Sequence, residues 1–390
     1  MRAAAEVFRV FLGLGLTSFG GPVAHLAYFR EAFVVRRRWL TEQGYADLVA
    51  LCQFLPGPAS SQVGMAIGLR RAGYLGMAAA WVAFSLPSAL LMVGFALGAQ
   101  ALEVTDDAGW LRGLKAAAVA VVAHAVLGMA RTLAVGARRA AIAVAALVVV
   151  LLLPSAWSQV AVIALGGLLG LLLLTPDAAP EDEETAAVPV GRRAAVGAFV
   201  AFVGLLVALP ALAALVDDPT LGLVDSFYRA GSLVFGGGHV VLPLLEAETV
   251  GSGLEQSSFL AGYGAAQAVP GPLFTFSAYL GTVLPTPGGP LGGLVALLAI
   301  FAPSALLVIA GLPSWERLRG SSRARQFLAG TGAAVVGILA AALYDPVFTQ
   351  GVTGVGTFAV AVLAFLALAV GRAPAWAVVI TASGLGLLVL

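Results

Sequence analysis

The sequence has few charged residues. Asp, Glu, Lys and Arg make up 11% of its 390 residues, and 60% of the residues are hydrophobic. A soluble domain carries about 25% charged residues, so a soluble fold of this length could not bury so much apolar surface. The apolar residues recur in segments of about 17–25 residues, the length that crosses a bilayer. The composition therefore excludes a soluble protein and predicts an all-α, polytopic membrane protein.

Cysteine is also scarce, which excludes the chemistry that depends on it. The single cysteine, Cys52, can form neither a disulfide within the chain nor a cysteine-based metal site. The sequence contains no nucleotide-binding loop of the Walker type, no Gly-x-Ser-x-Gly elbow and no His-Glu-x-x-His motif. The net charge of +1 gives no basis for binding nucleic acid. We therefore expect no enzyme, cofactor, metal or nucleic-acid partner, and a lipid bilayer as the surroundings.

The chain contains an internal repeat. Phe-Gly-Gly at 19–21 recurs at 235–237, and Pro-Ser-Ala-Leu-Leu at 87–91 recurs at 303–307, with the same offset in both cases. Between them, Pro-Gly-Pro at 56–58 recurs at 270–272, two positions short of that offset. A two-residue deletion in the intervening loop explains the difference. Order and spacing persist from position 19 to position 91, which argues against a chance match.

The repeat divides the chain. We predict a first repeat at 1–175, an acidic linker loop at 176–193, a connecting transmembrane helix at 194–216 and a second repeat at 217–390. The acidic run at 181–184 lacks the alternation of a calcium-binding loop, so a solvated linker is the expected role. Each repeat has six apolar segments, and one connecting helix lies between the repeats. An odd number of segments therefore separates equivalent positions of the two repeats. The sequence therefore predicts inverted-topology repeats, a common plan among secondary transporters.

The arginines predict which segments turn back within the membrane. If every segment crossed, Arg36-Arg37-Arg38 would lie opposite Arg70-Arg71, against the rule that basic residues face the cytoplasm. If segments 5–29, 45–69, 223–245 and 258–284 are re-entrant hairpins, nearly all arginines collect on one side. We therefore predict nine full crossings, four hairpins and a cytoplasmic N-terminus. No small-residue cleavage site is present near the N-terminus, so we expect direct insertion into the bacterial inner membrane.

Each predicted hairpin has a Gly- or Pro-rich break near its centre. Proline lacks an N–H and clashes with the preceding helical turn, and glycine permits positive φ, so each segment becomes two half-helices. The free N–H groups of the half-helices that follow the breaks would face the midplane and form an anion site. Hydroxyl, amide and imidazole groups follow directly. The predicted substrate-binding residues are Gly20, Gly21, His25, Gly57, Ser60, Ser61, Gln62, Gly237, Gly238, His239, Gly271, Thr275 and Ser277.

Each of these residues also has a structural interpretation. Glycine and proline often only pack or kink a transmembrane helix, and His25 and His239 can equally be hydrogen-bonded core residues. Arg30 and Glu31 at the cytoplasmic edge, and Glu246 and Glu248 at the opposite mouth, are either gating residues or interface anchors. Asp47 is either a proton carrier or a solvated charge at a helix start.

The repeated motifs resemble those of the chromate ion transporter family in its long, two-domain form. The resemblance is carried by Phe19-Gly20-Gly21-Pro22-Val23-Ala24-His25, Tyr28-Phe29-Arg30, Arg36-Arg37-Arg38-Trp39-Leu40, Gln53-Phe54-Leu55-Pro56-Gly57-Pro58 and the segment 235–244, and it covers nearly the whole chain. It implies chromate efflux driven by the proton motive force and chromate resistance, with sulfate as a structural analogue. Transport of sulfate or another anion, an anion channel and a membrane scaffold stay open as alternatives, as does a homodimer.

Overall fold

The computed structural model describes residues 2–19, 21–101, 108–153, 155–175, 190–216, 218–234, 241–250, 253–315 and 321–390. Its first half contains α1 (Arg2–Thr17), α2 (Gly21–Arg30), η1 (Glu31–Arg36), α3 (Glu42–Phe54), α4 (Ala59–Ala101), α5 (Gly109–Leu133), α6 (Ala137–Leu152), α7 (Ala156–Leu173) and α8 (Arg192–Val216). The second half contains α9 (Pro219–Leu233), α10 (Val241–Thr249), α11 (Gln256–Ala268), η3 (Leu273–Thr275), α12 (Phe276–Val283), α13 (Gly289–Gly311), η4 (Leu312–Ser314), α15 (Ser322–Ala342), η5 (Leu343–Phe348), α16 (Thr349–Gly351), α17 (Val355–Ala369) and α18 (Ala375–Val389).

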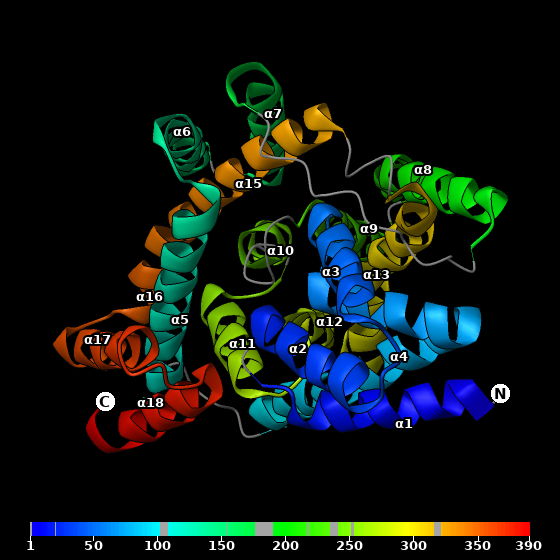
Figure 1. Cartoon of the computed structure of the whole chain (residues 1–390). Helices are drawn as coiled ribbons and strands as arrows, with labels where there is room; N and C mark the ends of the chain where they lie inside the picture. Colours follow the sequence, from blue (N-terminus) through cyan, green and yellow to red (C-terminus); the bar gives the residue numbers. More distant parts are fainter. Residues whose placement is uncertain are drawn as a thin grey trace.

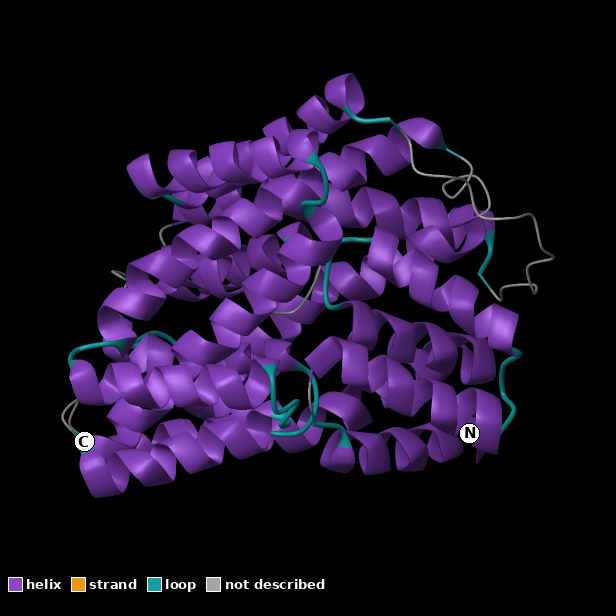
Figure 2. Cartoon of the chain, turned by 60° about the vertical axis from the view of Figure 1, so that its left-hand side comes forward, coloured by secondary structure: helices purple, strands orange, loops and turns teal. Residues whose placement is uncertain are grey.

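These residues form helices joined by short loops, with no strand in the described ranges (Figure 2). Among the described helices, five are long and apolar enough to cross a membrane: 59–101, 109–133, 192–216, 289–311 and 322–351. The apolar surface of α8 is largely exposed, with Leu215 81% and Val207 68% accessible, as expected for a helix surrounded by lipid. The prediction of an all-α, polytopic membrane protein is confirmed.

Helix α4 consists of two helices. The backbone leaves helical geometry at Ala72 and Gly73, where Gly73 has φ of +64°, and the chain doubles back. A Cβ on Gly76 would lie 2.1 Å from the carbonyl oxygen of Gly68, so only glycine permits this close return. In the same way, a Cβ on Gly281 of α12 would lie 2.2 Å from the carbonyl oxygen of Gly292 in α13. The turn within α4 therefore corresponds to the α12–α13 turn.

The helices follow the same order in both halves. α1, α2, α3 and the first part of α4 (59–71) precede the second part of α4 (74–101), α5, α6 and α7. In the second half α9, α10, α11 and α12 precede α13, α15, α17 and α18, and α8 lies between the two sets. The nine predicted crossings each coincide with one helix of this series. The crossing number and the domain boundaries stay predictions.

The helices form two bundles (Figure 1). One, which we call the site bundle, contains α1 to α4, α8, α9, α12 and α13; the other, the second bundle, contains α5 to α7 and α15 to α18. Each bundle takes helices from both halves of the chain. α5 packs on α17 and α18, and α15 packs on α6 and α7, so the halves interlock. α10 and α11 lie between the bundles: α10 contacts α9, α7 and α15, and α11 contacts α4, α5 and α18.

Small residues hold the interlocked helices together. A Cβ on Gly113 of α5 would lie 2.2 Å from the carbonyl oxygen of Ala382 in α18. A Cβ on Gly170 of α7 would lie 2.3 Å from the carbonyl oxygen of Gln326 in α15. Small residues let membrane helices approach closely enough for extensive van der Waals contact. Gly170 and Gly386 occupy equivalent positions under the repeat offset, and both pack against the other half.

Candidate functional site

Three of the four predicted breaks lie in described residues, and all three interrupt helices. α1 ends at Thr17, and α2 begins at Gly21, where φ is +76°. α3 ends at Phe54 and α4 begins at Ala59; Gly57 between them has φ of +121°. Gly271, between α11 and η3, has φ of +98°. The fourth break, with Gly237, Gly238 and His239, lies outside the described residues, as does Gly20.

The breaks of the two repeats meet through reciprocal hydrogen bonds. The backbone N–H of Gly57 donates to the carbonyl oxygen of Val234, at 2.7 Å. The backbone N–H of Gly271 donates to the carbonyl oxygen of Ser18, at 2.9 Å. Ser18 and Val234 are equivalent positions, each directly after the first helix of its repeat. Both glycine N–H groups are therefore engaged by the protein, and an anion here has to be bound by other donors.

A serine from the opposite repeat lies against each of these glycines. A Cβ on Gly57 would lie 2.4 Å from the Oγ of Ser304, and a Cβ on Gly271 would lie 2.7 Å from the Oγ of Ser88. Both serines are fully buried. Sequence reasoning used their Pro-Ser-Ala-Leu-Leu motif only to mark the repeat. The signal it missed is a polar residue following a helix-interior proline in both copies.

His25 links three parts of the first repeat. Its Nε2 lies 3.2 Å from the carbonyl oxygen of Ser18, and its Nδ1 lies 3.3 Å from the Oγ of Ser60. Because a carbonyl can only accept, Nε2 carries the hydrogen and Nδ1 accepts from the Ser60 hydroxyl. His25 and Ser60 are buried, and the His25 ring meets the edge of Phe84 at 5.2 Å. The structure thus brings together two predicted residues and engages both ring nitrogens with protein.

The remaining polar candidates divide into two groups. Gln62 donates from Nε2 to the carbonyl oxygen of Pro56, and Thr275 donates to that of Pro272, so both cap their own breaks. By contrast, the Oγ atoms of Ser61, Ser277 and Ser304 are buried and have no hydrogen-bond partner among the described residues. Leaving a buried donor without a partner costs about 1–3 kcal/mol. The Oγ of Ser18, at the first break, is also buried and without a partner in the described part of the chain, so these four hydroxyls are the candidates to meet a ligand.

Two predicted gating residues lie in exposed ion pairs. Arg30 donates from Nη2 to the Oε2 of Glu42 at 3.0 Å, and this guanidinium lowers the pKa of the Glu42 carboxyl. Glu31 accepts from the Nε of Arg36 at 2.8 Å. All four side chains are roughly half exposed or more. Exposed pairs of this kind contribute little to stability, and the choice between interface anchors and gating residues stays a prediction.

The second repeat contains a buried ion cluster that sequence reasoning missed. Arg229 of α9 lies 3.1 Å from Asp225, four residues earlier on the same helix, and 2.8 Å from Glu248 of α10. Glu246 lies two residues before Glu248 and accepts a hydrogen bond from Gln256 at 2.9 Å. Charges four residues apart within an apolar segment are the signal that could have identified Asp225 and Arg229.

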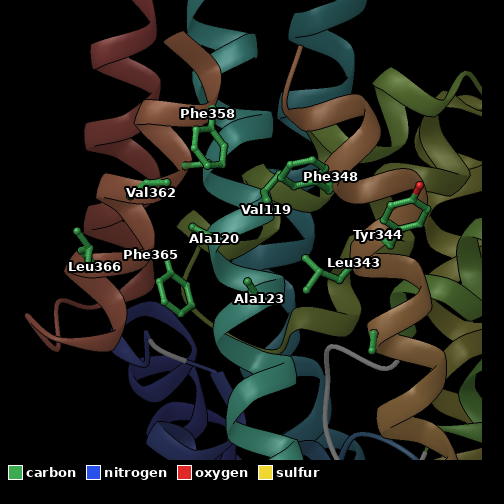
Figure 3. A pocket seen from close by; sticks show the side chains of 12 residues that line it. Val119, Ala120, Ala123, Leu343, Tyr344, Phe348, Phe358, Val362, Phe365 and Leu366 are labelled. Atoms are coloured by element: carbon green, nitrogen blue, oxygen red, sulfur yellow. The ribbon is translucent and has the colours of Figure 1, made fainter. Parts of the chain in front are cut away.

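A large pocket in the second bundle does not suit an anion (Figure 3). It has a volume of about 480 Å³ and lies between α5, η5 and α17. Its lining is aliphatic and aromatic, with Val119, Phe358 and Phe365 among its side chains, and Tyr344 supplies its only hydroxyl. A doubly charged anion here would lose its hydration without enough replacement donors. This pocket therefore gives no support for an anion site in the second bundle, and the breaks stay the candidate site.

Taken together, the helices and their paired breaks define a polytopic membrane protein built from a duplicated unit. The chain belongs to the chromate transporter family, whose model matches residues 5–171 and again residues 221–387. The second match begins and ends the same number of residues after the first match. That number equals the offset between the repeated motifs, which confirms the internal repeat. The predicted resemblance is confirmed.

Individual relatives are similar over most of their length. A chromate transport protein of Pseudomonas aeruginosa is 29% identical over 87% of this chain and 80% of its own. A chromate transport protein of Cupriavidus metallidurans is 27% identical over 87% and 81%. An uncharacterized transporter of Methanocaldococcus jannaschii, MJ0718, is 25% identical over 87% and 83%. No solved structure matches the chain.

Proposed function

We propose that this protein is a secondary transporter of a tetrahedral oxyanion, and that it exports chromate across the bacterial inner membrane using the proton motive force. The observation that carries the proposal is that the Gly57 and Gly271 breaks are each bonded to the other repeat, at Val234 and Ser18, and are flanked by buried, unpartnered hydroxyls. The names of the chromate transport proteins to which the chain is similar support chromate as the anion. Export of this anion would give chromate resistance.

An inverted arrangement of the repeats is part of this proposal. A twofold axis between the repeats would carry the bond from Gly57 to Val234 onto the bond from Gly271 to Ser18, so the reciprocal pair supports a twofold relation. The single helix α8 between the two sets of helices supports placing that axis in the membrane plane. The half-helices beside the breaks support re-entrant hairpins. α3 has 13 residues and spans about 20 Å, which is too short to cross a hydrocarbon core of about 30 Å. Broken backbone at this depth needs protein around it, which the opposite repeat supplies.

Hydroxyl and N–H donors would bind the anion. The first N–H groups of α4 lack intrahelical acceptors and carry the positive end of the helix dipole. Ser61 lies in this first turn, with Ser304 beside the preceding Gly57, while Ser277 lies near the start of α12. These groups offer directional donors without a fixed positive charge, so a dianion can be bound and released. Charge-assisted hydrogen bonds to an oxyanion are about twice as strong as neutral ones.

The proposal is tested with purified protein in liposomes. We expect chromate to accumulate when a pH gradient is imposed, and labelled chromate to exchange against unlabelled chromate without a gradient. Replacing Ser61 and Ser277 together by alanine should weaken chromate binding by about tenfold or more, since each lost donor contributes about 1 kcal/mol. Thr132→Ala is the matched control, because that exposed hydroxyl bonds only to its own helix.

Three results would contradict parts of the proposal. Equal losses from Thr132→Ala and from the double serine variant would mean that the breaks do not bind the anion. Flux without trans-stimulation would indicate a channel instead of a carrier. Sulfate exchange without chromate exchange would keep the site but change its substrate.

A further inference from the structure

The helix pair α9–α10 contains a buried cluster of three charged side chains. The Nη2 of Arg229 lies 3.1 Å from the Oδ2 of Asp225 and 2.8 Å from the Oε2 of Glu248. The three side chains are only 11–14% exposed. A buried charged group in a membrane protein is rare and usually belongs to an ion pathway or proton relay. We call these residues the Asp225–Arg229–Glu248 triad.

The triad contains one negative charge more than its arginine neutralises. With both carboxylates ionised, the net charge of −1 is held in a poorly solvated place, where two like charges close together disfavour joint ionisation. One proton makes the triad neutral. We propose that the Asp225–Arg229–Glu248 triad is the proton-binding site of this carrier, and that Asp225 takes up and releases one proton in each transport cycle. This rests on the proposed coupling to protons, but not on which anion is carried.

The hydrogen bonds distinguish the two carboxylates. Glu248 accepts from the Arg229 guanidinium and also from the hydroxyl of Ser226, at 2.8 Å. Asp225 is bonded to Arg229 at the longer distance of 3.1 Å. Hydrogen bonds donated to an ionised carboxylate favour that form, so Glu248 is the better stabilised anion. The proton therefore goes to Asp225.

Few other charges lie on the helices that pack against the triad. α9 packs on α8, α10 and α13, and α10 packs also on α7 and α15. α7 and α13 carry no charged residue. Most other charged groups of these elements lie toward helix ends: Arg192 and Arg193 of α8, Asp218 before α9, Arg323 and Arg325 of α15, and Asp345 of η5. Glu246 lies two residues before Glu248 on α10 and is bonded to Gln256. Among these described helices the triad is the cluster in which a cation lies between two carboxylates.

Protonation of Asp225 changes the strength of the interaction between α9 and α10. When Asp225 is ionised, Arg229 is shared between two carboxylates, and Asp225 repels Glu248. When Asp225 is protonated, it is neutral, and Glu248 is the ionised carboxylate that remains in the triad. Glu248 then no longer shares the Arg229 guanidinium with a second anion, so the interaction between α9 and α10 becomes stronger. α10 also contacts α7 and α15 of the second bundle (Figure 1), so the proton biases a contact between the bundles.

Helix α9 also reaches the proposed anion site. α9 continues from Arg229 to Leu233, and the next carbonyl oxygen, of Val234, accepts the hydrogen bond from Gly57. A shift of α9 therefore moves an acceptor that holds a break. The first repeat has no such cluster, because its equivalent positions are Arg9, Gly13 and Ala32. Each chain accordingly has one triad, on one side of the proposed axis.

The test compares exchange with accumulation in liposomes. Asp225→Asn removes the proton acceptor and leaves a neutral triad, so chromate exchange without a gradient should stay within about threefold of the unmodified protein. Accumulation driven by a pH gradient should be lost, and the exchange rate should no longer depend on pH. Asp225→Glu should restore both. The control is Glu42→Gln, an exposed paired carboxylate, which should accumulate chromate normally.

A second variant protects the test against misfolding. Glu248→Gln leaves Asp225 as a neutral pair with Arg229, so it too should exchange chromate without coupling. Gradient-driven accumulation at the normal level by either exchange-competent variant overturns the proposal. If the unmodified protein exchanges chromate but never accumulates it, coupling itself is wrong and the triad has no such role. If it does not exchange chromate, the proposed function has failed instead.

Discussion

The Oγ of Ser304, in the second repeat, lies against the α-carbon of Gly57, in the first, where a β-carbon would be only 2.4 Å away. The equivalent pair, Ser88 and Gly271, makes the reverse contact. Each Pro-Gly-Pro break is thus fitted to a serine of the other repeat. The glycines are required by this tertiary contact and by their positive φ together.

Gly57→Ala should destabilise the protein. At φ of +121° alanine is strained, and its β-carbon would clash with Ser304. We expect a loss of about 1–3 kcal/mol, measured as reduced unfolding stability in detergent. Gly94→Ala, on the second part of α4 with nothing within 4 Å of its β-carbon, is the matched control and should cause no loss. Equal stability of the two variants would contradict the contact.

Removing the Ser304 hydroxyl should relieve part of this strain. In a double-mutant cycle, Ser304→Ala combined with Gly57→Ala should be less destabilised than the two single changes added together. We expect a coupling of about 0.5–3 kcal/mol, the range for residues in contact. The positive φ of Gly57 remains, so the rescue should be partial. Strict additivity would mean that the two residues do not interact.

The local features of the site could be predicted from the sequence, because they arise from local causes. Glycine and proline interrupt helices wherever they occur together, so the breaks at Gly57 and Gly271 were predicted correctly. The predicted segment 45–69 ends just before the turn around Gly73, because Arg70 and Arg71 interrupt the apolar run there. The repeat offset was also readable, because duplicated motifs keep their spacing.

The partners across the repeats could not be predicted. That Gly57 bonds to Val234, and that Ser304 lies beside Gly57, depends on how helices far apart in the sequence pack. The free N–H groups expected at the glycines are therefore engaged. The triad was missed for a similar reason: Glu248 was weighed as a residue at the membrane edge, and only the pairing of α9 with α10 joins it to Arg229.

His25→Ala should mainly lower stability. The substitution removes the contacts of both ring nitrogens, with Ser18 and Ser60, and leaves the buried Ser60 hydroxyl without this partner. We expect a loss of about 1–3 kcal/mol in unfolding stability and less than a threefold change in the KM for chromate. His124→Ala, on the exposed side of α5, should be neutral. A large rise in KM at unchanged stability would instead make His25 a substrate ligand.

Breaking the Arg30–Glu42 pair should leave transport intact. In the folded protein Arg30 lowers the pKa of Glu42, so any stabilisation is present above the ordinary pKa of glutamate. It disappears as the pH falls through the lowered value. Arg30→Gln should therefore lower the stability slightly at neutral pH, and the difference from the unmodified protein should vanish once the pH is below the lowered pKa of Glu42. The chromate transport rate of Arg30→Gln at neutral pH should equal that of the unmodified protein, and a strong fall would favour a gate.

Enlarging either interlocking glycine should separate the bundle helices. Gly170→Leu would place its side chain against the Gln326 carbonyl of α15, and Gly386→Leu would do so against the Gly109 carbonyl of α5. Neither backbone atom can move without shifting its helix, so both variants should lose at least the about 1–3 kcal/mol that overpacking typically costs. Gly128→Leu, with nothing within 4 Å of its β-carbon, controls for the added side chain. Because the two contacts are equivalent in the two repeats, thermal unfolding should show similar losses for Gly170→Leu and Gly386→Leu. A loss of stability in only one variant would mean that only one of the two equivalent contacts stabilises the packing of α5 and α15 on the opposite half.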